Sequence, residues 1–328
     1  MTAPATVTSR TRRCESVEHG VRRFSRGHVY PARKRIPWAL VIIIAACVPV
    51  DGRAEEDKYA ETLSGAVTII HRSGREFKGT VRAVSDSEIS ILEQVDAGEV
   101  IFTFTREEVR RLIFPGESLW STAADLEADG EEDEAISLMR ALFDQRARFL
   151  FWLGEEDLVR FKLLADAYLH SGQSVEAIAV AGRLRPLIGN LAVRTQLDEA
   201  VLLGHYRLGL IDEARSLAES WIEQRSIVTD SAVGWWVLAQ LQFEAQEFEQ
   251  SLWTALRPIV FSGRFPVRYL GHCYATAIAA ALEIDDHREA DILRREMAGR
   301  ELDWPDIASM TPYRVEDFPV DTVFQTDQ

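Results

Sequence analysis

Runs of apolar residues typical of helices fill the chain from Ser118 to Arg300, and one short polar phrase interrupts them five times. In each copy a small or polar residue ends one run, and a small residue five positions later lies inside the next run. The copies are GEEDEAI (130–136), GQSVEAI (172–178), GLIDEAR (209–215) and two weaker ones, QEFEQSL (246–252) and DDHREAD (285–291). By subtraction, spacings of 42, 37, 37 and 39 separate the inner residues Ala135, Ala177, Ala214, Ser251 and Ala290. A period of this size with two helices per repeat predicts a helical solenoid of about five helix-turn-helix units.

The pattern before the repeats is different, because short alternating segments separated by turn residues predict β-strands. The expected strands are 66–70, 76–84, 88–94, one around 100–104, and 109–114. Gly79 lies inside the second strand, where a strand in a small barrel must bend. Residues 105–108 are expected to form one helical turn, and Pro115-Gly116 marks the boundary. Five strands in about 50 residues favour a small closed barrel.

Two of the repeats carry a specific resemblance. Ala165-Asp166-Ala167-Tyr168 precedes Gly172, and Gly204-His205-Tyr206 precedes Gly209, with an acidic and a small residue after each glycine. In these features residues 118–300 resemble tetratricopeptide (TPR) repeats, which implies a right-handed superhelix of stacked helix pairs. Small residues suit the positions where two helices cross closely, and glycine permits the left-handed turn. The fourth and fifth copies depart from the family pattern, with Gln246 and Asp285 in place of glycine.

A second resemblance covers only one hairpin. The stretch RSGREFKGTV (72–81) resembles the turn and second strand of Sm-like barrels. The second Sm motif, which supplies RNA contacts in that family, is missing, so the resemblance implies the fold and no RNA site. Arg72, Arg75 and Lys78 form a small basic patch that either docks a partner or is a solvated edge.

The N-terminal region is typical of an export signal, because a basic stretch ends at residues 33–35 and an apolar run of about 13 residues (38–50) follows. Two processing routes remain open. Residues 44–47 resemble a lipobox, in which Cys47 is lipidated, whereas Gly52-Arg53-Ala54 suits an ordinary signal peptidase that cuts before Glu55. A third possibility is an uncut signal anchor. The long basic region also allows a translation start downstream of Met1.

The fold class is therefore α+β and mainly α, with five segments. They are a signal peptide or lipoprotein signal region (1–54), a linker (55–65), a small Sm-like barrel (66–115), a TPR-like solenoid (116–300) and an extended tail (301–328). The tail holds Trp304, Tyr313, Phe318 and Phe324, which we expect to pack along the solenoid. The apolar run 148–153, which lies in the longest gap between repeats, is expected to be buried within the chain or by a partner.

Charge narrows the choice of partners. The formal net charge is −15, but residues 1–54 hold ten basic and three acidic residues, so the remainder carries −22. An acidic body disfavours nucleic acid and anionic lipid, since phosphate contacts need cationic side chains. We expect a protein or peptide partner, no nucleic acid, and membrane contact only through an N-terminal lipid or anchor.

Catalytic and metal-binding patterns are not found in the sequence. The histidines are dispersed, the phosphate and dinucleotide glycine motifs are missing, and there is no GxSxG. Cys273 lies among alanines and is expected to be a buried helical thiol. No cofactor, no metal and no enzymatic activity are therefore predicted.

In the TPR family the first helix of each unit lines a concave groove that binds extended peptides. We apply the family's first-helix positions to each repeat of this chain. The resemblance then implies that the groove is lined by Lys162, Asp166, His170, Glu199, Arg207, Trp236, Gln240 and Phe243. Alternatively, Trp236 and Phe243 pack between repeats. The sequence therefore predicts a non-catalytic scaffold or adaptor of the bacterial cell envelope, periplasmic or membrane-anchored. The alternatives are a subunit of an envelope transport, assembly or energy-transducing complex, and an unrecognised enzyme that acts on cell-wall glycan through groove carboxylates.

Overall fold

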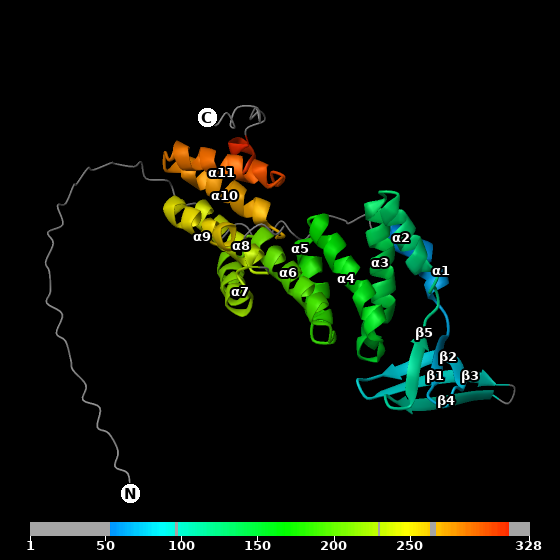
Figure 1. The fold of residues 1–328 in the computed structure, drawn as a ribbon. Helices are drawn as coiled ribbons and strands as arrows, with labels where there is room; N and C mark the ends of the chain where they lie inside the picture. The colour runs from blue at the N-terminus through cyan, green and yellow to red at the C-terminus, as the bar shows by residue number, and fades with distance from the viewer. Residues whose placement is uncertain (1–52, 96–97, 229, 263–266, 315–328) are drawn as a thin grey trace, which may run out of the picture. The chain divides into compact units, whose positions relative to one another are not determined.

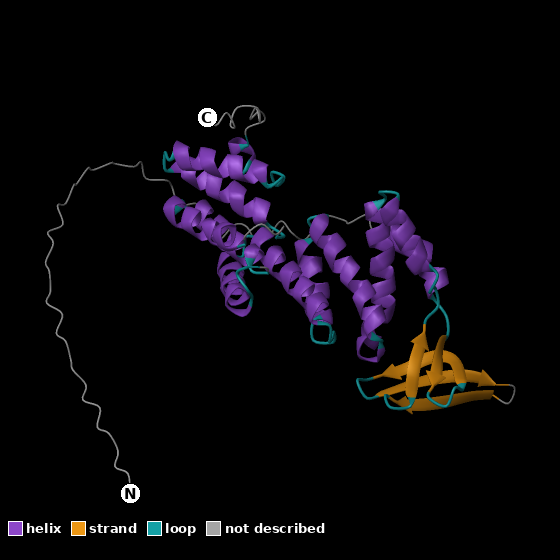
Figure 2. Ribbon diagram, in the orientation of Figure 1, coloured by secondary structure: helices purple, strands orange, loops and turns teal. Residues whose placement is uncertain are grey.

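The computed structural model describes residues 53–95, 98–228, 230–262 and 267–314 (Figures 1 and 2). This part of the chain is mainly helical, with one five-stranded antiparallel sheet that precedes most of the helices in the sequence. None of its helices is both long and apolar enough to cross a membrane. The predicted signal region, including Cys47, lies outside the described residues except for Arg53 and Ala54, which begin helix α1.

The sheet contains the five strands that the alternating pattern predicts. They are β1 (Val67–His71), β2 (Glu76–Val84), β3 (Glu88–Val95), β4 (Gly98–Thr105) and β5 (Val109–Ile113). The strand order is β4-β3-β2-β1-β5, and every neighbouring pair is antiparallel. Ile69, Ile89 and Ile91 are fully buried and form the centre of its apolar face.

The closed barrel that we expected is not observed, because the sheet is open. In the described residues β4 and β5 lie at opposite edges and no backbone pairing joins them. β2 does approach its neighbour closely, since a Cβ at Gly79 would lie 2.4 Å from the carbonyl oxygen of Leu92. However, β5 has only five residues and pairs with β1 alone. The expected helical turn at 105–108 is a plain turn, in which the Glu108 carboxylate accepts the backbone N–H of Thr105 at 2.8 Å.

The described helices after the sheet form five hairpins. Figure 1 shows the helices following one another in chain order. The first helices of the hairpins are α2 (Leu119–Ala128), α4 (Glu155–His170), α6 (Leu191–Arg207), α8 (Ala232–Glu244) and α10 (Leu270–Glu283). The second helices are α3 (Glu132–Arg146), α5 (Ser174–Leu184), α7 (Ile211–Gln224), α9 (Phe248–Phe261) and α11 (His287–Gly299). Besides its hairpin partner, α4 contacts α6, α6 contacts α8, and α8 contacts α10. This arrangement is TPR-like.

Every hairpin turns over three residues, and the middle residue of each turn has left-handed backbone geometry. These middle residues are the first residues of the five phrases, Gly130 (φ 80°), Gly172 (80°), Gly209 (69°), Gln246 (63°) and Asp285 (62°). Gln246 and Asp285 therefore adopt the same geometry as the glycines although each carries a Cβ, which makes it less favourable.

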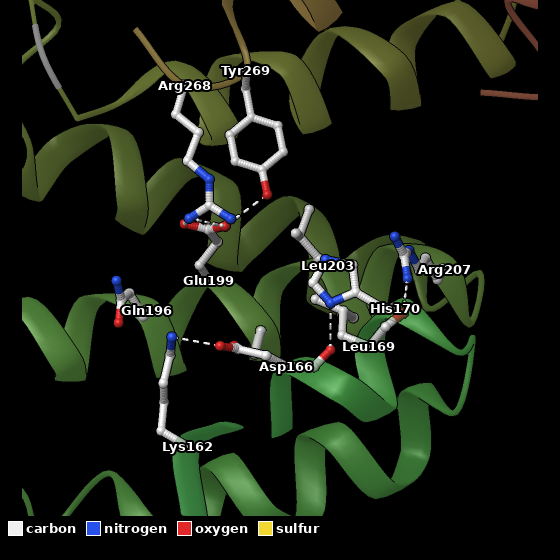
Figure 3. Close-up of a pocket in the computed structure, with 11 residues that line it drawn as sticks. Lys162, Asp166, Leu169, His170, Gln196, Glu199, Leu203, Arg207, Arg268 and Tyr269 are labelled. Atoms are coloured by element: carbon white, nitrogen blue, oxygen red, sulfur yellow. Dashed lines mark hydrogen bonds and ion pairs between the residues drawn. The ribbon is translucent and has the colours of Figure 1, made fainter. Parts of the chain in front are cut away.

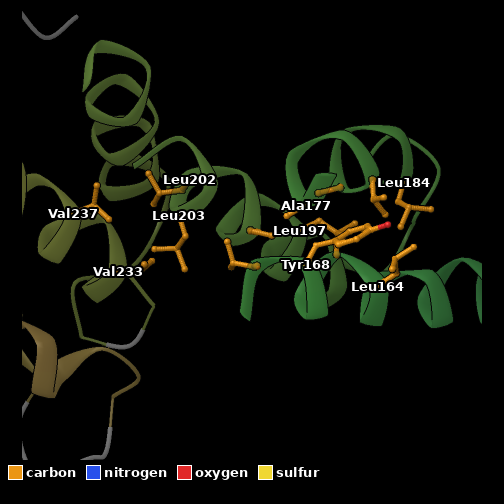
Figure 4. Close-up of a cluster of buried hydrophobic side chains, with 14 of the residues drawn as sticks. Leu164, Tyr168, Ala177, Leu184, Leu197, Leu202, Leu203, Val233 and Val237 are labelled. Carbon is orange, nitrogen blue, oxygen red and sulfur yellow. The ribbon is translucent and has the colours of Figure 1, made fainter. Parts of the chain in front are cut away.

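The inner small residues of the phrases lie where the helices cross. Ala177, Ala214, Ser251 and Ala290 are 0% exposed and Ala135 is 1% exposed, and Figure 4 shows Ala177 in the apolar core. The Ser251 hydroxyl donates to the carbonyl oxygen of Ala239 at 2.8 Å, so it is satisfied inside the core. The phrase thus fixes both the turn and the helix crossing, as the sequence indicated.

Two segments differ from simple connections. The expected linker 55–65 contains most of α1 (Arg53–Leu63), in which buried Tyr59 donates its hydroxyl to Glu134 at 3.0 Å. The apolar run lies in a short helix, η2 (Ala147–Trp152), and most of its large side chains are buried. The indole N–H of Trp152 donates to the carbonyl oxygen of Ser85 at 2.7 Å. Most of the run is therefore buried within the chain, whereas Phe151 is 43% exposed.

Candidate functional site

A polar hollow lies beside α4, α6 and the residues that precede α10 (Figure 3). It encloses about 480 Å³ of empty space, part of which is open to solvent. Its lining residues are Lys162, Asp166, Leu169, His170, Gln196, Glu199, Ala200, Leu203, Arg207, Arg268 and Tyr269. The hollow thus collects charged groups of both signs from three of the five hairpins.

The α4 wall is built from residues spaced four apart, which share one face of a helix. The Lys162 ammonium lies 2.5 Å from the Asp166 carboxylate, and both side chains are partly buried. One turn later, the His170 ring is held by its Nδ1, which lies 2.8 Å from the carbonyl oxygen of Asp166. These contacts orient the α4 side chains.

The α6 wall is dominated by a buried carboxylate, because Glu199 is only 8% exposed. The Tyr269 hydroxyl donates to its Oε1 at 2.6 Å, and the Arg268 guanidinium donates to its Oε2 at 3.1 Å. Burial raises the pKa of Glu199, while the Tyr269 and Arg268 contacts oppose that rise. A buried carboxylate needs such partners, since leaving it unpaired would be costly.

The residues that reach Glu199 come from far along the chain, and the backbone of one of them, Tyr269, is strained. Tyr269 has φ 67°, which is unusual for an aromatic residue and marks a position held in place by its surroundings. Its ring stacks on Trp236 of α8 with centroids 5.5 Å apart and an angle of 9°. Burial first, and the charge of Glu199 second, raise the pKa of Tyr269, so its hydroxyl stays protonated and donates.

Arg207 links two hairpins at the end of the hollow. Its guanidinium donates to the carbonyl oxygen of Leu169, in the last turn of α4. The last carbonyls of a helix lack internal partners and carry partial negative charge, so a cation there is favourable. Arg207 therefore fixes the position of α6 against α4 and also lines the hollow.

The structure brings together five of the eight predicted groove residues and separates the other three. Those that line the hollow are Lys162, Asp166, His170, Glu199 and Arg207. The three residues on α8 are buried instead, since Trp236, Gln240 and Phe243 are 6%, 0% and 9% exposed. In this structure they lie inside the fold, and their part in partner binding stays a prediction.

Sequence reasoning missed three polar residues of the hollow. Gln196 lies three positions before Glu199 on α6, so helical spacing is a signal that could have found it. Arg268 and Tyr269 lie just before α10, outside the first-helix positions of the repeat frame. Their approach to Glu199 depends on long-range packing, and no local pattern points to it.

His272 and Cys273 lie in the first turn of α10, directly after the residues that reach Glu199. Cys273 is 0% exposed and burial raises its pKa, so it is the buried thiol that we expected rather than a nucleophile. The His272 ring lies edge-on to Trp236 at 4.7 Å. Burial, with a smaller effect from the Arg268 charge, lowers the pKa of His272 to about 4.

Chemically, the hollow offers ammonium, guanidinium and amide donors beside carboxylate acceptors. Such a mixture can hydrogen-bond both the N–H and C=O groups of an extended chain, or oppositely charged side chains. Among the described residues, no group of three or more histidine, cysteine or acidic side chains is placed to hold a metal ion. The basic patch of Arg72, Arg75 and Lys78 belongs to the sheet and its first turn, and it shares no residue with the hollow.

No protein-family model and no curated protein matches the chain. Among solved structures, the chain is similar to two crystal structures of TPR-like repeats from Podosopora anserina, described as nearly identical repeats of a putative kinesin light chain. Their TM-scores are 0.43 and 0.42. Both are 15% identical, and each match covers 56% of this chain and 93% of the other. This likeness concerns the fold alone, and the TPR-like description above stands on the helix hairpins themselves.

Proposed function

We propose that the protein is a non-catalytic interaction scaffold or adaptor of the bacterial cell envelope, and that it binds an extended segment of a partner protein in the α4–α6 hollow. The observation that carries the proposal is the hollow itself. Its donors and acceptors come from three hairpins, and internal ion pairs and hydrogen bonds hold them in place before binding. Solenoids of helical repeats commonly use such surfaces to bind other proteins.

In this proposal the five hairpins form one continuous right-handed solenoid. Its first helices share the inner face, which explains why residues from α4 and α6 meet those preceding α10. An acidic body and a hollow with both charge signs fit a polar protein segment better than nucleic acid. No cofactor is required.

The proposed location is the periplasm or the envelope surface, reached through the N-terminal signal. The mature protein begins either at a lipidated Cys47 or at Glu55, or it keeps an uncut anchor. The protein is purified from envelope fractions and its N-terminus is identified by mass spectrometry. This measurement distinguishes the three outcomes. Finding the full-length chain in the cytoplasm would overturn the envelope assignment.

An enzyme that acts on cell-wall glycan is the second candidate, because two carboxylates, Asp166 and Glu199, line one hollow and the pKa of Glu199 is raised. Both carboxylates are engaged, however. Lys162 pairs with Asp166, and both oxygens of Glu199 accept hydrogen bonds from Tyr269 and Arg268. These contacts support a role in shaping the hollow more than a role in proton transfer.

Capture of partners from solubilised envelopes tests the proposed function. We expect the wild-type chain to retain a defined protein, and the double variant Lys162→Ala/Gln196→Ala to retain at least tenfold less of it. Arg288→Ala is the matched control, since it removes an exposed cation from α11, far along the chain from the residues of the hollow. If the control and the double variant retain equal amounts, or if nothing is captured while the pure protein cleaves wall polymer, the proposal is wrong.

A further inference from the structure

The inner face of α8 and α10 is covered by residues 301–314 of the same chain, which follow α11. The Gln240 side-chain amide donates to the Ser309 hydroxyl at 2.9 Å. Phe243 meets the ring of Tyr313 edge-on, with centroids 5.8 Å apart. The Tyr313 hydroxyl donates to the Glu283 carboxylate at 2.5 Å, and burial together with Glu283 raises the pKa of Tyr313 to about 12.

The surface beneath the segment is shaped for a polypeptide backbone. Gly271, in the first turn of α10, has no side chain, and a Cβ there would lie 2.8 Å from the backbone carbonyl oxygen of Asp303. Met310 fills an apolar site completely and is 0% exposed. On α10, the Thr276 hydroxyl oxygen lies 2.9 Å from the carbonyl oxygen of His272 and 3.1 Å from the side-chain oxygen Oε1 of Gln240. The side-chain amide nitrogen of Gln240 faces Ser309.

The segment itself resembles a bound peptide more than a further repeat. Its only regular element is a three-residue helix, η3 (Thr311–Tyr313). Pro305 and Met310 are its buried residues, whereas Asp306, Ala308 and most of their neighbours are exposed. Residues 302–306 form no helix or strand, and turns and η3 follow them. A few buried anchors therefore hold a segment with little regular structure against α8 and α10, as peptide ligands are held on folded domains.

We propose that the inner face of α8 and α10 is a binding site for an extended protein segment, and that residues 301–314 are its intramolecular ligand. The external ligand has the same chemistry, an apolar anchor in the Met310 position and a tyrosine three residues later. It binds when it displaces residues 301–314. This site is separate from the α4–α6 hollow, and it accounts for the burial of Gln240 and Phe243, which the repeat frame assigns to a groove.

The test uses the full-length chain and a fluorescein-labelled synthetic peptide with the sequence of residues 301–314. Met310→Asp introduces a charge at the buried anchor and releases the chain's own segment, while the α8–α10 surface stays unchanged. We expect this variant to bind the peptide at least tenfold more tightly than wild type. Ala308→Asp adds the same charge at an exposed position of the same segment, so it is the matched control and should behave as wild type.

A second variant shows where the peptide binds. Adding Gly271→Ala to the Met310→Asp chain places a methyl group against the peptide backbone, and the tenfold gain should be lost. Gly182→Ala is its control, because a Cβ at that helical position of α5 meets no atom within 4 Å. Retained binding in the Gly271→Ala chain would contradict the proposed site.

Two measurements show whether residues 301–314 act as a displaceable ligand or as a fixed part of the fold. Circular dichroism should show unchanged helical content in Met310→Asp, and hydrogen exchange of wild type should be faster in residues 301–314 than in α10. Unfolding of the variant, exchange as slow as in α10, or no peptide binding to Met310→Asp would each overturn the proposal. The outcome does not depend on the α4–α6 hollow, whose residues are unchanged in all of these variants.

Discussion

The face of α4 and α6 that lines the hollow and the face of α8 and α10 that contacts residues 301–314 both belong to first helices of hairpins, but their side chains differ in chemistry. Around the first, Lys162, Asp166 and Glu199 line an open hollow. In the second, Trp236 and Phe243 are buried, partly beneath the chain's own C-terminal segment. The repeated phrase determines the turn and the helix crossing, but it leaves the inward side chains free to differ. A shared fold therefore does not imply a shared binding surface.

The boundary between the two surfaces is a single stack of side chains. Tyr269 lies on Trp236 on one side and donates to Glu199 on the other. The aromatic surface thus positions the group that pairs with the buried carboxylate of the polar surface.

The largest effect is expected for Trp236→Ala, because this side chain is nearly buried and contacts the rings of Tyr206, Tyr269 and His272. Removing it should lower the free energy of unfolding by about 3–5 kcal/mol. Lys162→Ala, on the polar surface, should lower it by less than about 1 kcal/mol. Urea unfolding followed by circular dichroism measures both. Equal losses would show that the two surfaces do not differ as described.

A smaller effect concerns pH, through His272. Its pKa is about 4 in the folded chain and 6.5 in the reference state, so the unfolded state binds more protons between these values. Stability therefore falls as the pH drops from 6.5 toward 4, by about 2 kcal/mol between pH 7 and pH 4.5. His272→Phe removes this contribution. The difference in unfolding free energy between wild type and variant should therefore change by about 2 kcal/mol between pH 7 and pH 4.5. If the unfolding free energies of wild type and His272→Phe change with pH in parallel, the lowered pKa of His272 is contradicted. As a control, similar stability of the two proteins at pH 7 would confirm that phenylalanine fits at this position.

The smallest effect compares the turns of the earlier and later hairpins. Gln246→Gly should raise the free energy of unfolding by about 1 kcal/mol, because glycine adopts the left-handed geometry without a Cβ penalty. The reciprocal change, Gly209→Ala, should lower it by about the same amount. Thermal unfolding of both variants measures the pair. A destabilised Gln246→Gly chain would mean that the glutamine side chain contributes more than its backbone strain costs.

The features that the sequence predicted well are those that depend on neighbouring residues. Five turns and five buried small residues follow from one phrase, because each turn needs one left-handed residue and each crossing needs one small side chain. The five strands also follow from local alternation and turn residues. Barrel closure was predicted wrongly, since it depends on whether β4 and β5 meet, which alternation does not specify.

The candidate site was predicted in part for the same reason. Lys162 and Asp166 share a face of α4 by helical spacing, and the resemblance to TPR repeats implied that Glu199 of the next hairpin lies beside them. Gln240 donates a hydrogen bond to Ser309, 69 residues away, and the Glu199 carboxylate accepts one from Tyr269, 70 residues away. The repeat pattern of the sequence does not predict contacts between residues this far apart.

The hydrogen bond from Tyr269 to Glu199 also has a consequence for how the array folds and evolves. Glu199 belongs to the third hairpin, and the groups that neutralise it immediately precede the fifth. In an ideal linear array each unit interacts only with the next, so units can be added or removed freely. Here, removal of the fifth hairpin together with the residues that precede it would leave the Glu199 carboxylate without Tyr269 and Arg268. We therefore expect the third and fifth hairpins to gain or lose order together.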